Sequence, residues 1–337
     1  MEPETILHFK TGFLERPITL PQDSIVNFRI FKETPNLFWA RPFFINKNQI
    51  GFGYYGEADP SAIEVKSKVD RNFRYLINKN REMDTLNFWF RGPDRDSLRV
   101  GIKEKDTTKQ YTIKFGKVLR DSLVISPITS QTMGLLDSFK IESNLPLVKI
   151  DLDLIKIKGL DSLPVSFKAS LDKNYDRLSL FYEWLPNDDY KIELLPNALV
   201  DFWGSTHDTL RFRAKTKPIE DYGEVILQIL REDQDPFILE LVDLDGEAIR
   251  RYDEPNELDA FEFKFLPPGK YLFRYTRDNN GNKKWDTGSY LKKIQPEMVY
   301  YSKDTIDLRA NWEINQQLSI PSEEPSFSAI DSLEILN

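Results

Sequence analysis

The chain contains no cysteine, and among its 337 residues there are only two histidines, His8 and His207. The absence of cysteine excludes disulfides, zinc–thiolate sites, iron–sulfur clusters and cysteine nucleophiles. Two histidines so far apart in sequence exclude a multi-histidine metal site, and a Ser–His–Asp triad would have to use one of them. His207 lies in a turn before a strand without a nucleophile elbow, which favours a polar loop over a general base. We therefore predict that the protein is not an enzyme and has no catalytic residues.

Excess basic charge and long apolar runs are also missing. Lys and Arg number 46 against 54 Asp and Glu, a formal net charge of -8. This balance disfavours binding to nucleic acid and disfavours a polybasic membrane patch. No apolar run approaches the roughly 18 residues of a membrane-spanning helix. Residues 1–20 lack the charged start, apolar middle and small-residue cleavage site of a signal peptide.

What the sequence does contain is alternation of apolar and polar residues with a period of two. Hydrophobic residues make up 40% and aromatic residues 13% of the chain. The alternation is clear over 178–184, 210–214 and 271–275. Successive side chains of a strand point to opposite faces, so these short runs predict an all-β chain of tandem antiparallel β-sandwiches. Among the strands we expect one helical turn over 195–201 and another short turn over 130–139.

A short signal for the start of a strand recurs along the chain. Asp, then Ser or Thr, then Leu or Ile recurs along the chain, and at the seven positions named below an apolar or alternating run follows or continues. Asp and Ser or Thr bond to nearby backbone groups and favour turns, and the aliphatic residue begins the ladder. We interpret the pattern as a turn-to-strand start; it begins at Asp23, Asp84, Asp96, Asp121, Asp161, Asp208 and Asp304.

Proline-bearing junctions at Thr34-Pro35, Ser126-Pro127 and Lys217-Pro218 predict the domain boundaries. The residues around Asp23 weakly repeat those around Asp304, which makes the start of the chain look like the end of a module whose upstream part is missing. The predicted parts are remnant strands over 1–33, a β-sandwich over 34–125, an Ig-like domain over 126–217, a third sandwich over 218–318, and a tail over 319–337.

Gly51, Gly53 and Gly56 match the G-x-G-x-x-G pattern of dinucleotide sites. Such a site needs the glycines in a tight turn that opens a helix, so that helix N–H groups meet the pyrophosphate. Here aromatic residues fill the pattern, Pro60 follows, and no amphipathic helix comes next. We therefore predict a glycine-interrupted strand and no nucleotide cofactor.

Oxygen-bearing residues occupy alternate positions of one polar loop, at Asp278, Asn280, Asn282 and Asp286. Two interpretations stay open: a calcium loop with these four residues as ligands, or a polar hairpin turn. An EF-hand loop has glycine at its sixth position and glutamate at its twelfth, where this chain has Lys283 and Ser289. The hairpin is therefore favoured, and calcium is the only cofactor that the sequence suggests.

Exposed aromatic side chains can stack on sugar rings or anchor a protein partner. Trp89 lies between Phe88 and Phe90 and therefore points to the other face of the strand from these two rings. We expect its indole to be exposed or to pack on a neighbouring domain. Trp285 lies in the polar loop just described. These two tryptophans are the candidate residues for binding a glycan or a partner.

Two regions resemble known modules. Residues 138–216 resemble the SbsA-type Ig-like domains of bacterial cell-surface proteins, through the strands at 147–151, 178–180 and 190–199 and the Asp201–Gly204 corner. The Pro267-Pro268-Gly269 stretch with the strand after it resembles a prealbumin-like or carboxypeptidase-regulatory-like module. Residues 278–316, and in the middle of the chain residues 41–54, are similar to Ig-like-domain lipoproteins of Bacteroidota.

The resemblance implies location more than mechanism. It implies a non-enzymatic structural or interaction protein of the cell envelope, associated with the outer membrane and binding other envelope proteins. It also implies lipidation and export, although neither can be read in this chain. The alternative that stays open is a surface glycan-binding module, assisted by calcium.

Overall fold

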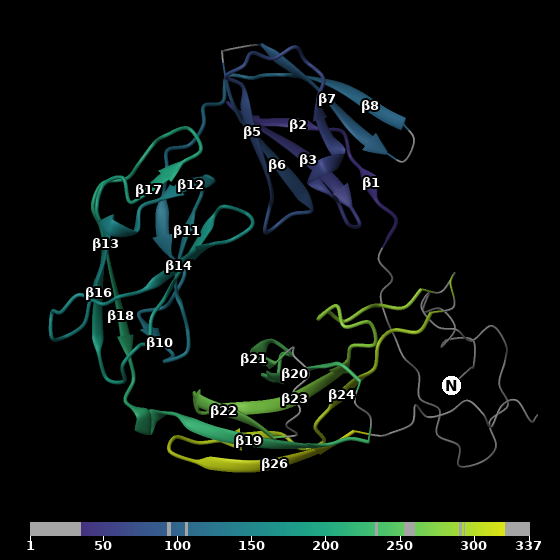
Figure 1. Cartoon of the computed structure of the whole chain (residues 1–337). Helices are drawn as coiled ribbons and strands as arrows, with labels where there is room; N and C mark the ends of the chain where they lie inside the picture. The colour runs from purple at the N-terminus through teal and green to yellow at the C-terminus, as the bar shows by residue number, and fades with distance from the viewer. Residues whose placement is uncertain are drawn as a thin grey trace, which may run out of the picture. The chain divides into compact units, whose positions relative to one another are not determined.

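The computed structural model describes residues 35–92, 96–104, 107–232, 235–252, 260–289, 292 and 294–320, which form two compact units, 35–218 and 219–320. Strands dominate the described residues, and no α-helix occurs among them (Figure 1). Three short 3-10 helices lie between strands, at Pro60–Ala62, Leu152–Leu154 and Ile219–Asp221. The prediction of an all-β chain of antiparallel sandwiches is confirmed. The predicted remnant strands at 1–33 and all but two residues of the predicted tail lie outside the described residues.

Residues 35–115 form the first sandwich. One sheet has the order β1-β3-β6-β5 with β2 also paired to β3, and the other has the order β4-β7-β8. Their inner faces alternate with outer residues and share one core, which includes Phe52, Phe88 and Val100. The strands are β1 Phe38–Trp39, β2 Phe43–Asn46, β3 Gln49–Tyr55, β4 Ile63–Val65, β5 Arg74–Lys79, β6 Thr85–Arg91, β7 Ser97–Glu104 and β8 Thr107–Lys114.

Residues 125–216 form the second sandwich. Its sheets have the orders β10-β18-β16-β13 and β14-β15-β11-β9, and a two-stranded β12-β17 ribbon accompanies them. Phe139 and Phe212 approach from opposite sheets, with ring centroids 6.0 Å apart. The strands are β9 Ile125–Pro127, β10 Thr132–Met133, β11 Phe139–Ser143, β12 Leu147–Ile150, β13 Ile155–Lys158, β14 Lys168–Leu171, β15 Arg177–Phe181, β16 Asp189–Leu194, β17 Leu199–Asp201 and β18 Leu210–Thr216.

The third sandwich is the unit 219–320. Sheet β22-β19-β26 faces sheet β21-β20-β23-β24, to which β25 is added through β23. Its core includes Val225, Leu239, Phe263 and Phe273. The strands are β19 Gly223–Leu230, β20 Phe237–Val242, β21 Ala248–Tyr252, β22 Ala260–Leu266, β23 Gly269–Arg277, β24 Val299–Tyr301, β25 Ile306–Leu308 and β26 Glu313–Ser319.

The turn-to-strand signal marks a strand start at four of its six positions in the described residues, and no strand begins within two residues of Asp121 or Asp161. Strands β6, β7, β18 and β25 begin one or two residues after Asp84, Asp96, Asp208 and Asp304. The helical turn expected over 195–201 is wrong. Asn197 has a φ of 69°, and β17 begins at Leu199, because the chain reverses through a left-handed residue instead of continuing a helix.

Candidate functional site: the junction between the first two sandwiches

The glycine pattern at 51–56 belongs to β3, as predicted. A Cβ at Gly51 would lie 2.5 Å from the Phe43 ring, so glycine allows that ring to cover the strand. Gly56 has a φ of 97°, a conformation that glycine adopts without strain. Close packing and a turn therefore account for these glycines, with no phosphate-binding helix after them.

His207 is a buried structural residue. Its Nε2 accepts a hydrogen bond from the Leu199 N–H at 3.3 Å, and its Nδ1 lies 2.6 Å from the Asp208 carbonyl oxygen. Both ring nitrogens thus contact backbone groups, which holds the loop before β18 in place. His8 lies outside the described residues.

The four residues of the proposed calcium loop are brought together, largely by hydrogen bonds within the loop. Asp278 accepts from the N–H groups of Asn282 and Lys283, at 3.1 and 2.8 Å. The Asn282 oxygen accepts from the Lys284 N–H at 2.8 Å, and its amide nitrogen donates to Asp286 at 2.7 Å. Within the described part of the chain, no three histidine or acidic side chains converge as a metal site would require.

A glutamate that the sequence analysis did not consider holds both ends of this loop. The Glu297 carboxylate accepts from the N–H groups of Asn279 and Asp286, each at 2.9 Å. Burial raises the pKa of Glu297, and the nearby Asp286 and Asp278 charges raise it further, while these hydrogen bonds lower it. Trp285 is 44% exposed, and its indole N–H donates to the Glu297 carbonyl oxygen at 3.1 Å. The sequence does not indicate this role, because Glu297 lies beyond the loop and no spacing pattern connects it to the loop residues.

Trp89 occupies a different setting from the one expected for a ligand-stacking residue. It is only 5% exposed, so of the two expectations the exposed indole is wrong and packing on a neighbouring domain is right. It forms a buried cluster with Leu145 and Phe202 of the second sandwich, against which Trp203 packs. The second sandwich covers the outward side of β6, which the alternation along that strand alone leaves undecided.

The aromatic half of this junction is built around Trp203. Its ring lies edge-on to Trp89, with centroids 5.8 Å apart, and its indole N–H donates to the Phe90 carbonyl oxygen at 3.1 Å. The Arg120 guanidinium lies 4.1 Å from the centroid of the Trp203 ring, at cation–π distance. Arg91 donates to the Phe202 carbonyl oxygen at 3.0 Å. These contacts join β6 and the linker before β9 to the corner that follows β17.

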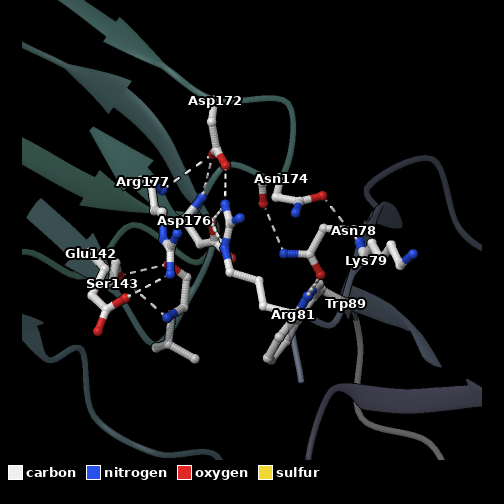
Figure 2. A network of polar contacts seen from close by, with 11 residues as sticks. Asn78, Lys79, Arg81, Trp89, Glu142, Ser143, Asp172, Asn174, Asp176 and Arg177 are labelled. Atoms are coloured by element: carbon white, nitrogen blue, oxygen red, sulfur yellow. Dashed lines mark hydrogen bonds and ion pairs between the residues drawn. The ribbon is translucent and has the colours of Figure 1, made fainter. Parts of the chain in front are cut away.

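The polar half of the junction meets the turn between β14 and β15 (Figure 2). Asn78 accepts from the Trp89 indole N–H at 2.7 Å and donates to the Asn174 carbonyl oxygen at 2.8 Å. Arg81 donates to Asp176 at 2.6 Å and also pairs with Asp172. Asn78 thereby connects the aromatic half to the polar half.

The turn that receives Arg81 is organised by its own side chains. Asp172 accepts from the N–H groups of Asp176 and Arg177, each at 3.2 Å, and Tyr175 has a φ of 62°. Burial raises the pKa of Asp176, the Arg81 hydrogen bond lowers it, and the charge of Asp172 raises it. One guanidinium therefore serves two neighbouring carboxylates. A cavity of about 300 Å³ lies beside this cluster, lined in part by Asn87, Trp89 and Leu145.

Comparison with known proteins identifies no family. No family model matches the chain, and no curated protein sequence matches it. Several solved structures align at low similarity over most of the chain. Domains A168–A170 of titin are 10% identical, covering 82% of this chain and 99% of that one with a TM-score of 0.21. The major pilin subunit BcpA of Bacillus cereus is 12% identical, covering 80% and 84%, with a TM-score of 0.21.

Domains 4–9 of the surface layer protein SbsC are 10% identical, covering 80% of this chain and 50% of that one, with a TM-score of 0.23. Scores and identities this low carry no argument about function. The all-β fold class rests on the sheets described above.

Proposed function

We propose that the chain is a non-enzymatic structural and interaction protein of the bacterial cell envelope, working as a lipoprotein-type component of an outer-membrane assembly. The structural role is supported mainly by the junction between the first two sandwiches. A spacer that presents binding faces at a set separation needs adjacent modules that hold each other, and flexible linkers do not supply this. Here aromatic packing, a cation–π contact and a two-carboxylate pair with Arg81 join the modules.

The envelope location has separate support. It comes from the resemblance of 138–216 and 267–315 to domains of cell-surface lipoproteins. No described helix is both long and apolar enough to cross a membrane. In the proposed assembly, attachment is expected through lipidation and through contacts with other envelope proteins, as the resemblance implies.

The test is recovery of the full-length protein from native membranes in mild detergent, followed by crosslinking and mass spectrometry. We expect it to fractionate with the outer membrane and to be crosslinked reproducibly to envelope proteins. A protein that migrates alone and crosslinks to nothing would contradict the proposal. A variant with Arg81→Gln and Trp203→Ala, which loosens the junction, serves as the matched comparison, because it should keep its location and lose crosslinks that depend on module spacing.

The second candidate, binding of surface glycans, is favoured at one position only. Trp285 has a half-exposed indole whose N–H is held by the Glu297 carbonyl oxygen, an arrangement that orients a ring for stacking. Trp89 has no comparable exposure. Glycan-array binding that is lost in Trp285→Ala and kept in Trp89→Phe would support this candidate, and equal loss in both variants would contradict it.

A further inference from the structure

The outward face of the sheet β10-β18-β16-β13 collects basic side chains that are scattered in the sequence. Lys158, Lys191 and Arg213 come from three different strands, and the strand register places them directly opposite one another, as Lys158 to Lys191 and Lys191 to Arg213. All three are exposed. We define them as the basic row. Its existence could not be read from the composition, which with a net charge of -8 argued against a polybasic patch.

The basic row differs from its neighbours on the same face. In the adjacent row Glu193 lies opposite both Lys156 and Arg211, and Arg211 pairs with it at 2.9 Å. On the other side Lys215 lies opposite Asp189, 3.3 Å away. Within the described residues, no acidic side chain lies within ion-pair distance of the basic row. Like charges directly opposite one another destabilise a sheet. The basic row therefore lowers the stability of the folded state, and folding does not explain why it is there.

Exposed leucines lie at the end of the sheet next to this row. Leu160 and Leu163 are 67% and 62% exposed, on the tight loop that follows Lys158. The loop is fixed by a hydrogen bond from the Ser162 N–H to the Gly159 carbonyl oxygen, and by one from the Leu160 N–H to Asp188. Leu185, 53% exposed, lies on the neighbouring loop before β16. Apolar loop tips beside a cationic surface are the combination by which proteins bind the interface of an anionic bilayer.

We propose that this end of the second sandwich is a peripheral docking surface for an anionic phospholipid bilayer, with the basic row meeting lipid phosphates and Leu160 and Leu163 entering the headgroup region. Charge complementarity selects an anionic surface, and the leucines favour a bilayer over a soluble acidic polymer. Glu193 and Asp189 in the two neighbouring rows each have a cation of their own, Arg211 and Lys215. More distant acidic charge acts weakly, because interactions beyond about 8 Å are largely screened at physiological salt. Asp161 lies on the same loop and accepts from the Leu163 N–H at 2.9 Å, so its carboxylate opposes binding while it shapes the loop.

The test is co-sedimentation of the full chain with vesicles of phosphatidylglycerol and phosphatidylcholine in equal amounts, against phosphatidylcholine alone. We expect binding to the anionic vesicles only, weakening as salt is raised. The triple variant Lys158→Gln, Lys191→Gln and Arg213→Gln should bind about 100-fold more weakly, since each basic residue near such a surface contributes about fivefold. Leu160→Ser with Leu163→Ser should weaken binding at least about tenfold. Asp161→Asn, which keeps the turn acceptor, should strengthen it.

The matched control is Lys114→Gln, Lys140→Gln and Lys168→Gln, the same charge change at exposed strand positions elsewhere in 35–218. We expect it to bind as the unaltered protein does. The melting temperature of the basic-row variant should be unchanged or higher, because the mutual repulsion is removed; this separates loss of docking from loss of folding. No binding to anionic vesicles, or equal losses in the basic-row and control variants, would overturn the proposal. The proposed envelope assembly would stand or fall separately, on its crosslinks.

Discussion

Two outward-facing sheet surfaces within residues 35–218 follow the same alternation and meet different surroundings. The outward face of β6 carries Trp89, which the second sandwich covers. The outward face of β13, β16 and β18 carries the basic row and remains exposed. The first is stabilised by what covers it, and the second keeps a repulsion that a partner of opposite charge would relieve. Alternation thus defines which residues face outward, while their surroundings decide whether an outward residue is structural.

The largest difference between the two surfaces should appear when the buried indole is removed. Trp89→Ala deletes a large buried side chain and leaves Asn78 without its donor, so we expect a loss of about 3 kcal/mol in the free energy of unfolding. Trp285→Ala, at the half-exposed indole, should cost less than about 1 kcal/mol. Urea unfolding followed by circular dichroism measures both. Equal losses would show that the junction contributes nothing beyond ordinary surface packing.

Removing the cation between the two carboxylates should have the next largest effect. Arg81→Gln leaves Asp172 and Asp176 facing each other, and we expect a loss of about 1–2 kcal/mol, reduced by the partial exposure of these side chains. Arg99→Gln, at an exposed position of the same sandwich, should stay within about 0.5 kcal/mol of the unaltered protein. A double-mutant cycle with Asp176→Asn should show coupling between positions 81 and 176. Additive losses would contradict a direct pair.

The stability of the junction should depend on pH through the carboxyl group of Asp176. Its pKa is raised in the folded protein, chiefly by burial, above the value of about 3.9 expected when the chain is unfolded. Between those two values the folded state binds more protons than the unfolded state. This contribution to stability therefore increases as the pH falls through the window. We expect the unaltered protein to gain stability relative to Asp176→Asn as the pH is lowered from neutral toward the unfolded-state pKa, as measured by urea unfolding at each pH. A relative loss would mean that the Arg81 contact outweighs burial.

The smallest change in stability is expected in the 278–288 loop of the third sandwich. Hydrogen bonds stabilise this loop as they do the junction, but its partners are close in sequence. Its oxygens already accept backbone N–H groups, and Lys283 adds a positive charge. We predict that millimolar calcium leaves the melting temperature of the full chain unchanged, with magnesium as the control for ionic strength. Asn282→Ala should cost less than about 1 kcal/mol. A shift of several degrees that is specific to calcium and reversed by a chelator would instead support calcium bound by Asp278, Asn280, Asn282 and Asp286.

The sequence by itself determined the strands and many of their starts. Period-two alternation and the turn chemistry of Asp followed by Ser or Thr are local properties, so β6, β7, β18 and β25 begin where that chemistry ends. The same local reading fails at Asn197, where a left-handed turn replaces the expected helical turn.

Only the tertiary structure decided which residues act together. Trp89 and Trp203 are 114 positions apart, and Lys158, Lys191 and Arg213 come from separate strands. Glu297 reaches back to Asn279 across 18 positions with no repeat to announce it. Strand register and the docking of one sandwich on another arise from contacts between distant segments, and the alternation within each strand is the same whichever neighbour it meets.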